Sequence, residues 1–327
     1  MFLESLQNFH TAMGREEWVA RWRKLGDAHR LAGELSLKKG AFEEATQACL
    51  CALTSFEVAR RLLDEDDPQF GELSTRIEEA IDVFGSSQAR KLQLVDISGC
   101  DQTEFPAYYL PGTGQDSCAP AVICISKEDE TGVTLLARLL PVVIDRNVSV
   151  LVVSHADVSN HVPAKSEMPL SCCLDYLSVQ HEIDDSRIGV YGEGLSAVLA
   201  TDFAVSDRRV AAAVCDGGLW NWARTLASVS WLATNQDVMD EDAASARRLR
   251  LVRQLRCPVL VVAGGRGIVS VSEATTLLAD CAAGRIDLEL LVSRMARTPM
   301  GDIENFVPSD DFIFGWMEHK LAHSSAT

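Results

Sequence analysis

Side chains able to transfer protons follow several short apolar segments of the sequence. His155 and Asp157 come after one such segment, Glu193 follows a second, and Asp216 follows a third. In open sheets of parallel strands, ligands bind beyond the carboxyl ends of the strands. Imidazole and carboxylate groups placed there can act as general acids or bases. His155, Glu193 and Asp216 are therefore the candidates for catalysis, and His155 is the best placed because imidazole titrates near neutral pH.

The elements that would position these side chains alternate from about residue 90 to the end of the chain. Alternating apolar residues predict strands at residues 91–97 and 105–110, and mostly apolar runs predict strands at residues 121–125, 148–153, 188–191, 210–215, 258–263 and 287–292. Helical patterns lie among them at residues 133–144, 169–180, 195–205 and 310–322. This alternation predicts an α/β protein with a doubly wound, mostly parallel sheet.

The N-terminal part of the sequence has a different pattern. Residues 1–88 contain no strand pattern, and the spacing of Trp18, Trp22, Leu31 and Leu35 predicts a helix with one buried face. Three or four helices fit into this segment, so we expect a helical subdomain there and an α/β core over residues 89–327.

One segment of the core interrupts the alternation. Residues 217–255 carry three tryptophans and then an acidic, alanine-rich stretch. We interpret this segment as a short cap inserted after the strand that ends at Cys215. Trp220 could then form an apolar wall of a ligand pocket.

Two motifs carry a resemblance to a known family. The stretch 187–193, which ends in Tyr-Gly-Glu, and the stretch 257–265, which ends in Ala-Gly-Gly, resemble segments of the α/β-hydrolase superfamily. The helical N-terminal segment narrows the resemblance to the subgroup that contains the fermentation–respiration switch protein and 2,6-dihydroxypseudooxynicotine hydrolase. The resemblance implies a serine on a sharp strand–turn–helix elbow of the form G-x-S-x-G. It also implies a homodimer and a small secondary metabolite as substrate.

The catalytic positions of that family are changed in this sequence. The serine position corresponds to Gly194, the acid position to Gly267, and the histidine position most closely to Met300. No histidine occurs between His181 and His319, so this last loss does not depend on the alignment. A serine nucleophile needs a base to deprotonate it and an acid to orient that base. We therefore expect the ordinary hydrolytic triad to be absent.

Several residues around the elbow have two interpretations. Ser196 is either a residue that bonds to backbone at the helix N-terminus or a displaced nucleophile. Glu193 either points sideways into the protein or lies beside the emptied nucleophile position. Asp216 either caps the following segment or faces the pocket. The residues expected to line the substrate pocket are Ser126, Lys127, Asp157, Leu195, Ser196 and Trp220.

Composition excludes some classes of partner. The formal net charge is −17, which argues against nucleic acid or an anionic membrane, because both require basic surfaces. The sequence has no phosphate loop, dinucleotide fingerprint or cluster of metal ligands, so we expect no cofactor and no metal. It also has no recognisable signal peptide and no apolar run long enough to span a membrane, so a cytoplasmic protein is expected.

Two classes of function remain. In the first, the protein is a non-hydrolytic enzyme that eliminates, cyclises or isomerises an apolar, polyketide-like or aromatic metabolite. In the second, it is an inactive pseudo-hydrolase that binds a ligand or serves as a scaffold. An atypical ester or C–C hydrolase is a third, weaker alternative. The fold alone does not decide among them.

Overall fold

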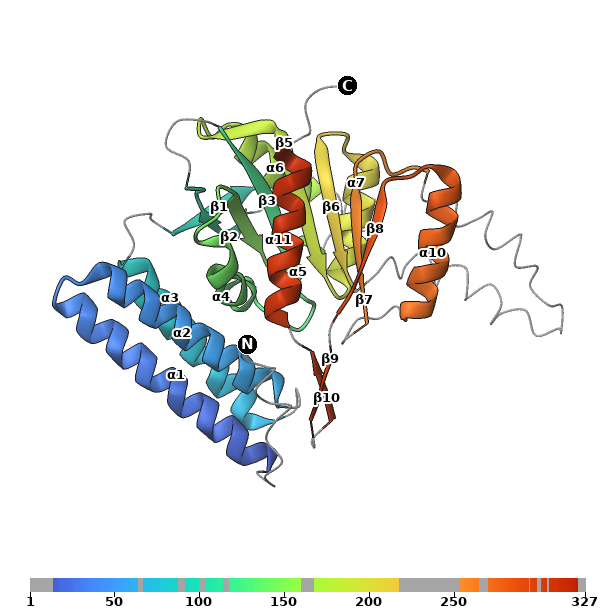
Figure 1. Cartoon of the computed structure of the whole chain (residues 1–327). Coiled ribbons are helices and arrows are strands. Elements are labelled where there is room, and N and C mark those ends of the chain that lie inside the picture. The colour runs from blue at the N-terminus through green and yellow to red at the C-terminus, as the bar shows by residue number, and fades with distance from the viewer. Residues whose placement is uncertain are drawn as a thin grey trace.

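Three helices form the N-terminal part of the protein. The computed structural model describes residues 14–63, 67–87, 92–99, 104–113, 118–159, 168–217, 253–264, 270–293, 295–298, 301–304 and 306–322. The helices are α1 (Arg15–Lys38), α2 (Phe42–Arg61) and α3 (Pro68–Ser87), and they lie side by side in Figure 1. Acidic residues in the first turns of α1 and α2 and basic residues in their last turns suit the helix dipole.

The buried face of α1 differs in part from the prediction. Trp18 and Trp22 are buried as expected, but Leu31 and Leu35 are 54% and 48% exposed. The buried face continues instead through glycines such as Gly33, where α2 approaches α1 closely. Leucines and glycines both recur at helical spacing along α1, and the face with the smaller residues is the buried one because α1 and α2 pack closely.

The core is a sheet whose order in the described part of the chain is β1-β2-β4-β3-β5-β6-β7-β8. Its strands are β1 (Gln93–Ser98), β2 (Glu104–Leu110), β3 (Ala119–Ile125), β4 (Ser149–Val153), β5 (Ile183–Glu193), β6 (Val210–Asp216), β7 (Val259–Ala263) and β8 (Leu288–Val292). Pairing is antiparallel among β1, β2 and β4 and parallel across the rest of the sheet. The predicted doubly wound, mostly parallel sheet is confirmed.

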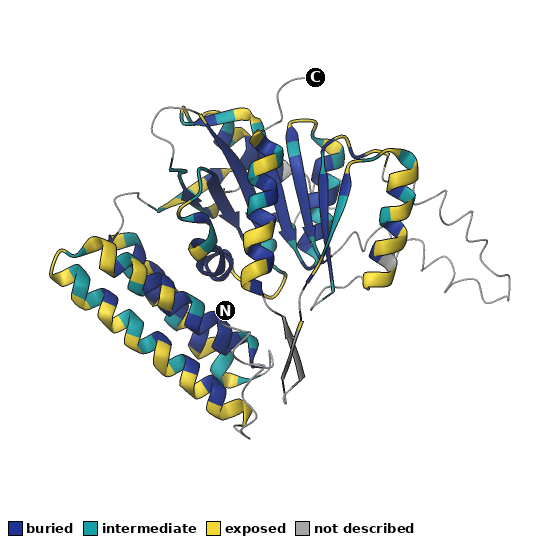
Figure 2. Cartoon of the chain, in the orientation of Figure 1, coloured by how far each residue is buried: buried dark blue, intermediate teal, exposed yellow. Residues whose placement is uncertain are grey.

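Helices cover both faces of this sheet (Figure 1). On one face lie α4 (Gly132–Val143) and α11 (Phe306–Ala322), and the N-terminal helices pack against α4. The other face carries α6 (Met168–Ser178), α7 (Ser196–Ser206) and α10 (Val271–Gly284). The central strands are buried between these layers, as Figure 2 shows, which explains their nearly continuous apolar runs.

Two short elements complete the description. Helix α5 (His155–Ser159) follows β4 directly, and the strands β9 (Met295–Thr298) and β10 (Gly301–Glu304) form a hairpin before α11. Most of the predicted cap, residues 218–252, lies outside the described residues, as do Gly267 and Met300. No helix within the described residues is both long and apolar enough to cross a membrane. The division into two domains near residue 88 stays a prediction.

Candidate functional site

Four neighbouring parallel strands end at one edge of the sheet and bring the predicted site residues together. The register pairs Ile125 of β3 with Val153 of β4 and with Gly192 of β5. It also pairs Glu193 with Asp216 of β6. The loops that leave these strands therefore begin side by side, which is the arrangement expected of a ligand site in an open α/β sheet.

The turn between β5 and α7 has the geometry of a nucleophile elbow. Gly194 stands at its tip with φ +59°, a conformation that glycine adopts without strain. The Gly194 N–H donates to the carbonyl oxygen of Asp216 at 2.7 Å. A Cβ at Gly192 would lie 2.2 Å from the carbonyl oxygen of Ser196, so only glycine fits beneath the turn. The backbone of the elbow is present, with glycine at the tip.

The loop that follows β3 folds over this elbow. Glu128 Oε2 accepts the backbone N–H of Leu195 at 3.0 Å. A Cβ on Gly194 would lie 2.6 Å from that oxygen and 2.8 Å from Lys127 Cγ. In hydrolases with a serine elbow, the N–H of the residue after the serine helps to bind the oxyanion. In this protein the corresponding N–H, that of Leu195, is bound by the Glu128 carboxylate.

His155 is joined to the elbow by a chain of hydrogen bonds. Ser196 Oγ donates to the carbonyl oxygen of Ser126 at 2.6 Å and lies 2.7 Å from His155 Nδ1. Because the hydroxyl has a single proton and the carbonyl can only accept, Nδ1–H is the donor in the second bond. Nε2 of neutral His155 is then the nitrogen that can accept a proton.

Ser126 holds the other side of this chain. Its hydroxyl accepts the backbone N–H of His155 at 3.1 Å and donates to the carbonyl oxygen of Glu130 at 2.8 Å. Ser126 and Ser196 are both buried, whereas His155 is half-buried and Glu128 is exposed. The serines therefore fix the histidine from inside the protein, and the histidine and the glutamate lie nearer to solvent.

The electrostatics of the site favour neutral imidazole. Burial lowers the pKa of His155, and the charge of Glu128 partly opposes that shift. An imidazole that is neutral at rest, and whose protonated form is stabilised by a nearby carboxylate, is suited to act as a general base. Burial raises the pKa of Asp157, while a hydrogen bond from Ser154 opposes the change.

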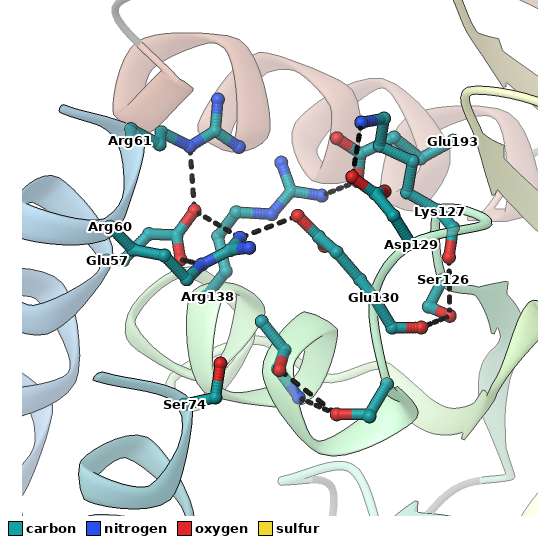
Figure 3. A network of polar contacts seen from close by, with 12 residues as sticks. Glu57, Arg60, Arg61, Ser74, Ser126, Lys127, Asp129, Glu130, Arg138 and Glu193 are labelled. Carbon is teal, nitrogen blue, oxygen red and sulfur yellow. Dashed lines mark hydrogen bonds and ion pairs between the residues drawn. The ribbon is translucent and has the colours of Figure 1, made fainter. Parts of the chain in front are cut away.

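Behind the elbow lies a buried cluster that we call the Arg138 cluster: Arg138, Tyr191, Glu193, Asp216 and Asp310. Arg138 comes from α4 and donates to Asp310 at 3.1 Å, to the Tyr191 hydroxyl at 2.9 Å and to Glu193 (Figure 3 shows the Arg138–Glu193 contact). The Tyr191 hydroxyl in turn donates to Asp216 at 2.9 Å. Glu193 and Asp216 are thus held in a structural arrangement beneath the elbow, which favours the sideways orientation of Glu193.

A second cluster, the Glu57 cluster (Glu57, Arg60, Arg61 and Glu130), links α2 to the loop after β3. Arg60 donates to Glu57 at 2.9 Å and to Glu130 at 2.6 Å, and Arg61 donates to Glu57 at 2.7 Å (Figure 3). Burial alone would raise the pKa of Glu57, but the two arginines outweigh it and lower the pKa to about 2. The N-terminal helices are therefore tied by charged groups to the loop that carries Glu128.

The remaining predicted pocket residues have mixed positions. Lys127 pairs with Asp129 at 3.0 Å and covers Gly194 with its side chain. Leu195 is half-buried at the elbow, Asp157 lies on α5, and Trp220 lies outside the described residues. The structure thus brings His155, Ser126, Lys127 and Ser196 together around Gly194.

Two residues of the site were missed at the sequence level. Glu128 has no motif, and its place over the elbow depends on how the loop folds. Arg138 had a usable signal, because it is the one charged residue in the mostly apolar stretch 132–143. An arginine in a buried helix requires acidic partners, but Asp310 lies 172 positions away and could not be identified by spacing.

Comparisons with known proteins show the fold. No protein-family profile matches the sequence, and no curated protein sequence matches it. The structure is similar to the crystal structure of 2,6-dihydroxy-pseudo-oxynicotine hydrolase, with 16% identity and a TM-score of 0.62 over 100% of this chain and 94% of that chain. It is similar to AbyA5 at 15% identity and a TM-score of 0.56, over 99% and 92% of the two chains.

A third similar structure is an acylaminoacyl peptidase in complex with Z-Gly-Gly-Phe-chloromethyl ketone. It has 12% identity and a TM-score of 0.51, over 73% of this chain and 43% of that chain. Together these similarities establish an α/β-hydrolase fold, and the first two extend over the N-terminal helices as well as the core.

Proposed function

We propose that this hydrolase-fold protein does not hydrolyse its substrate by acyl transfer but moves a proton on an apolar small molecule, with His155 as the base. The substrate class is a polyketide-like or aromatic compound with a carbonyl group. The reaction is an elimination, cyclisation or isomerisation. The observation that carries the proposal is the hydrogen-bond chain from Ser126 through Ser196 to His155 Nδ1, which leaves Nε2 to accept a proton.

The elbow supports the loss of acyl transfer in two ways. Gly194 provides no nucleophile at the tip of the turn. The Leu195 N–H, which an acyl-transfer enzyme would offer to an oxyanion, is bound by Glu128. Ser196 does not replace the nucleophile in this arrangement, because it is fully buried and its hydroxyl donates a hydrogen bond to the Ser126 carbonyl oxygen.

The proton transfer can be written for an elimination. His155 Nε2 takes a proton from the carbon next to the substrate carbonyl, and the C–H electron pair becomes the new carbon–carbon double bond. The leaving group departs from the neighbouring carbon with its bonding electrons and receives the proton from the imidazolium. The negative charge of Glu128 stabilises the imidazolium between these two events. In an isomerisation the same proton returns to a different carbon.

A specific observation favours the second candidate, a pseudo-hydrolase that binds without chemistry. Glu128 and Lys127 fill the space beside Gly194, where a substrate would otherwise reach the tip of the elbow. We retain the enzyme as the first proposal because His155 is only half-buried and Glu128 is exposed, so a ligand can approach the histidine from solvent without reaching the tip of the elbow.

The proposal is tested with aryl and long-chain alkyl ketones that carry an acetoxy or hydroxy group on the β-carbon. Turnover in D₂O and in H₂¹⁸O, followed by mass spectrometry, should give unsaturated ketones with no ¹⁸O in the released acetate. His155→Gln should lower turnover by at least about 100-fold, the usual contribution of a general base. The matched control His181→Gln, at a side chain that is 98% exposed, should retain turnover.

Three outcomes would contradict the proposal in different ways. Incorporation of ¹⁸O into the released acid would show that the protein hydrolyses the ester. Equal activity of His155→Gln and wild type would exclude His155 as the base. Saturable binding of these ketones without any chemical change would favour the pseudo-hydrolase.

A further inference from the structure

His155 is held at two points by one residue, Ser126. The Ser126 hydroxyl accepts the backbone N–H of His155, and the Ser126 carbonyl oxygen accepts the Ser196 hydroxyl that bonds to His155 Nδ1. Ser126 is fully buried, so bulk water does not compete for these bonds. A group that fixes the orientation of Ser126 therefore also fixes the histidine.

The loop after β3 begins with a turn, residues 126–130, that orients the Ser126 hydroxyl. This hydroxyl donates to the carbonyl oxygen of Glu130 at 2.8 Å, and the Glu130 N–H donates to the carbonyl oxygen of Lys127 at 3.1 Å. At one end the turn is anchored to the sheet, because the Ser126 N–H donates to the carbonyl oxygen of Val153 at 3.0 Å. At the other end, the Glu130 side chain makes a contact outside the α/β core.

That contact comes from the N-terminal helices. Arg60 Nη2 on α2 donates to Glu130 Oε1 at 2.6 Å, as Figure 3 shows. The side chains of Arg60 and Glu130 are 5% and 8% exposed, so solvent ions screen this pair very little. Arg60 is held in turn by bonds of 2.9 and 3.1 Å to Glu57, and it lies over the Phe70 ring of α3, 5.1 Å from the ring centre. Two N-terminal helices thus fix the guanidinium that holds Glu130.

We infer that Arg60 and Glu130 are positioning residues for His155. They act through the turn that carries Ser126, and they keep the neutral ring in the tautomer with Nδ1 protonated and Nε2 unprotonated. The inference rests on the proposed function in taking His155 as the base, whereas the hydrogen bonds themselves do not depend on the reaction. It gives the N-terminal helices a role in a site that the α/β core carries.

Loss of the Arg60–Glu130 ion pair has a defined effect on the ring. The peptide group that carries the Ser126 carbonyl lies within the 126–130 turn, so release of Glu130 lets this carbonyl turn away from Ser196. The Ser196 hydroxyl then donates to His155 Nδ1, and the neutral ring carries its proton on Nε2. A protonated Nε2 cannot take a proton from a substrate. The tautomer of His155 therefore reports on the position of Glu130.

The inference is tested by nuclear magnetic resonance on the full chain labelled with ¹⁵N-histidine, because the nitrogen chemical shifts of the ring distinguish its two neutral tautomers. Wild type should show Nδ1–H at His155. Glu130→Ala removes the carboxylate while Arg60 keeps its bonds to Glu57, and it should shift neutral His155 to the Nε2–H form. Glu130→Gln keeps the side-chain volume and an acceptor oxygen for Arg60, so it should retain Nδ1–H.

A control in the N-terminal helices separates positioning from general destabilisation. Arg76→Met breaks the ion pairs of α3 with Asp27 and Glu72, which involve no residue of the turn. It should make the protein unfold at lower urea concentration and leave the His155 tautomer unchanged. Arg60→Lys keeps the charge but loses the planar fork that reaches two carboxylates. It should shift the tautomer as Glu130→Ala does, and it carries the test if Glu130→Ala does not fold.

Turnover of the β-substituted ketones gives a second readout. Glu130→Ala misplaces the base without removing a contact to the substrate, so it should lower kcat by up to about 100-fold and leave KM unchanged. Glu130→Gln should restore kcat. The inference is overturned if wild type lacks Nδ1–H at His155, if the folded Glu130→Ala and Arg60→Lys variants keep it, or if Arg76→Met shifts the tautomer equally. A tautomer that shifts as expected in a protein that turns over no ketone would refute the proposed reaction and still support the positioning.

Discussion

Replacing Gly194 by alanine should reveal the contact between the elbow and the loop after β3. A residue with a Cβ pays about 1–2 kcal/mol to adopt the left-handed backbone that Gly194 has at φ +59°. The new Cβ would also lie 2.6 Å from Glu128 Oε2 and displace the carboxylate from the Leu195 N–H. Loss of that hydrogen bond adds about 1 kcal/mol. Gly194→Ala should therefore lower the free energy of unfolding by about 2–3 kcal/mol.

A double-mutant cycle measured by urea unfolding separates the two costs. In a Glu128→Ala background, Gly194→Ala should cost only about 1–2 kcal/mol, because backbone strain remains and the displaced hydrogen bond is already gone. Gly85→Ala in α3 is the matched control, since a Cβ there meets nothing within 4 Å. It should show no coupling to position 128. Equal costs of Gly194→Ala in the two backgrounds would refute the placement of Glu128 over the elbow.

Three further outcomes are expected. The pKa of Glu57 is about 2 instead of 4.5, so its ionised form stabilises the fold by on the order of 3 kcal/mol; this contribution is complete above about pH 4.5 and is lost as the pH falls toward 2. Urea unfolding from pH 6 to 2 should therefore show the free energy of unfolding falling with pH, and Glu57→Gln should reduce that pH dependence. The pKa of the His155 ring should lie below the usual 6.5, and the neutral ring should carry its proton on Nδ1. Glu128→Gln should lower this pKa further, because the carboxylate raises it. Nitrogen chemical shifts of the ring measure both the pKa and the tautomer, and an unchanged pKa in the variant would contradict the role of Glu128. Arg138→Met leaves Glu193 and Asp310 without their shared cation and should lower the free energy of unfolding in urea by about 3–5 kcal/mol, the cost of breaking a buried ion pair. A decrease below about 1 kcal/mol would contradict a stabilising role of the Arg138 cluster.

The sheet was predictable because its strands are buried on both faces. Runs such as 121–125 and 150–153 are apolar throughout, as expected of parallel strands buried between two helix layers. The N-terminal helices were predictable from their period, but the buried face of α1 was predicted incorrectly at Leu31 and Leu35. Apolar spacing identifies a helix, whereas the choice between two similar faces is made by the neighbouring helix.

The elbow was predictable for a related reason. A buried strand, closely spaced glycines and a helix specify the turn locally, and Gly194 has the positive φ that this turn requires. The position of His155 near the elbow followed from the end of β4. Its bond to Ser196 did not, because it depends on the register between strands and on the loop carrying Ser126.

The charged groups around the elbow were beyond sequence reasoning. Arg138 meets Asp310 across 172 positions and Arg60 meets Glu130 across 70. Such pairs form after the helices pack, and no local pattern encodes them. Glu128 is a similar case, since its surface loop acquires a role only when it folds over Gly194.

Whether the elbow still performs acyl transfer is measured most directly by treating the wild-type chain with a fluorophosphonate and determining its intact mass. Ser196 is buried and its hydroxyl donates a hydrogen bond to the Ser126 carbonyl oxygen. No adduct should therefore form at Ser196, with or without prior incubation with a ketone substrate. A stoichiometric adduct that peptide mapping assigns to Ser196 would show a working nucleophile and contradict the proposed loss of acyl transfer.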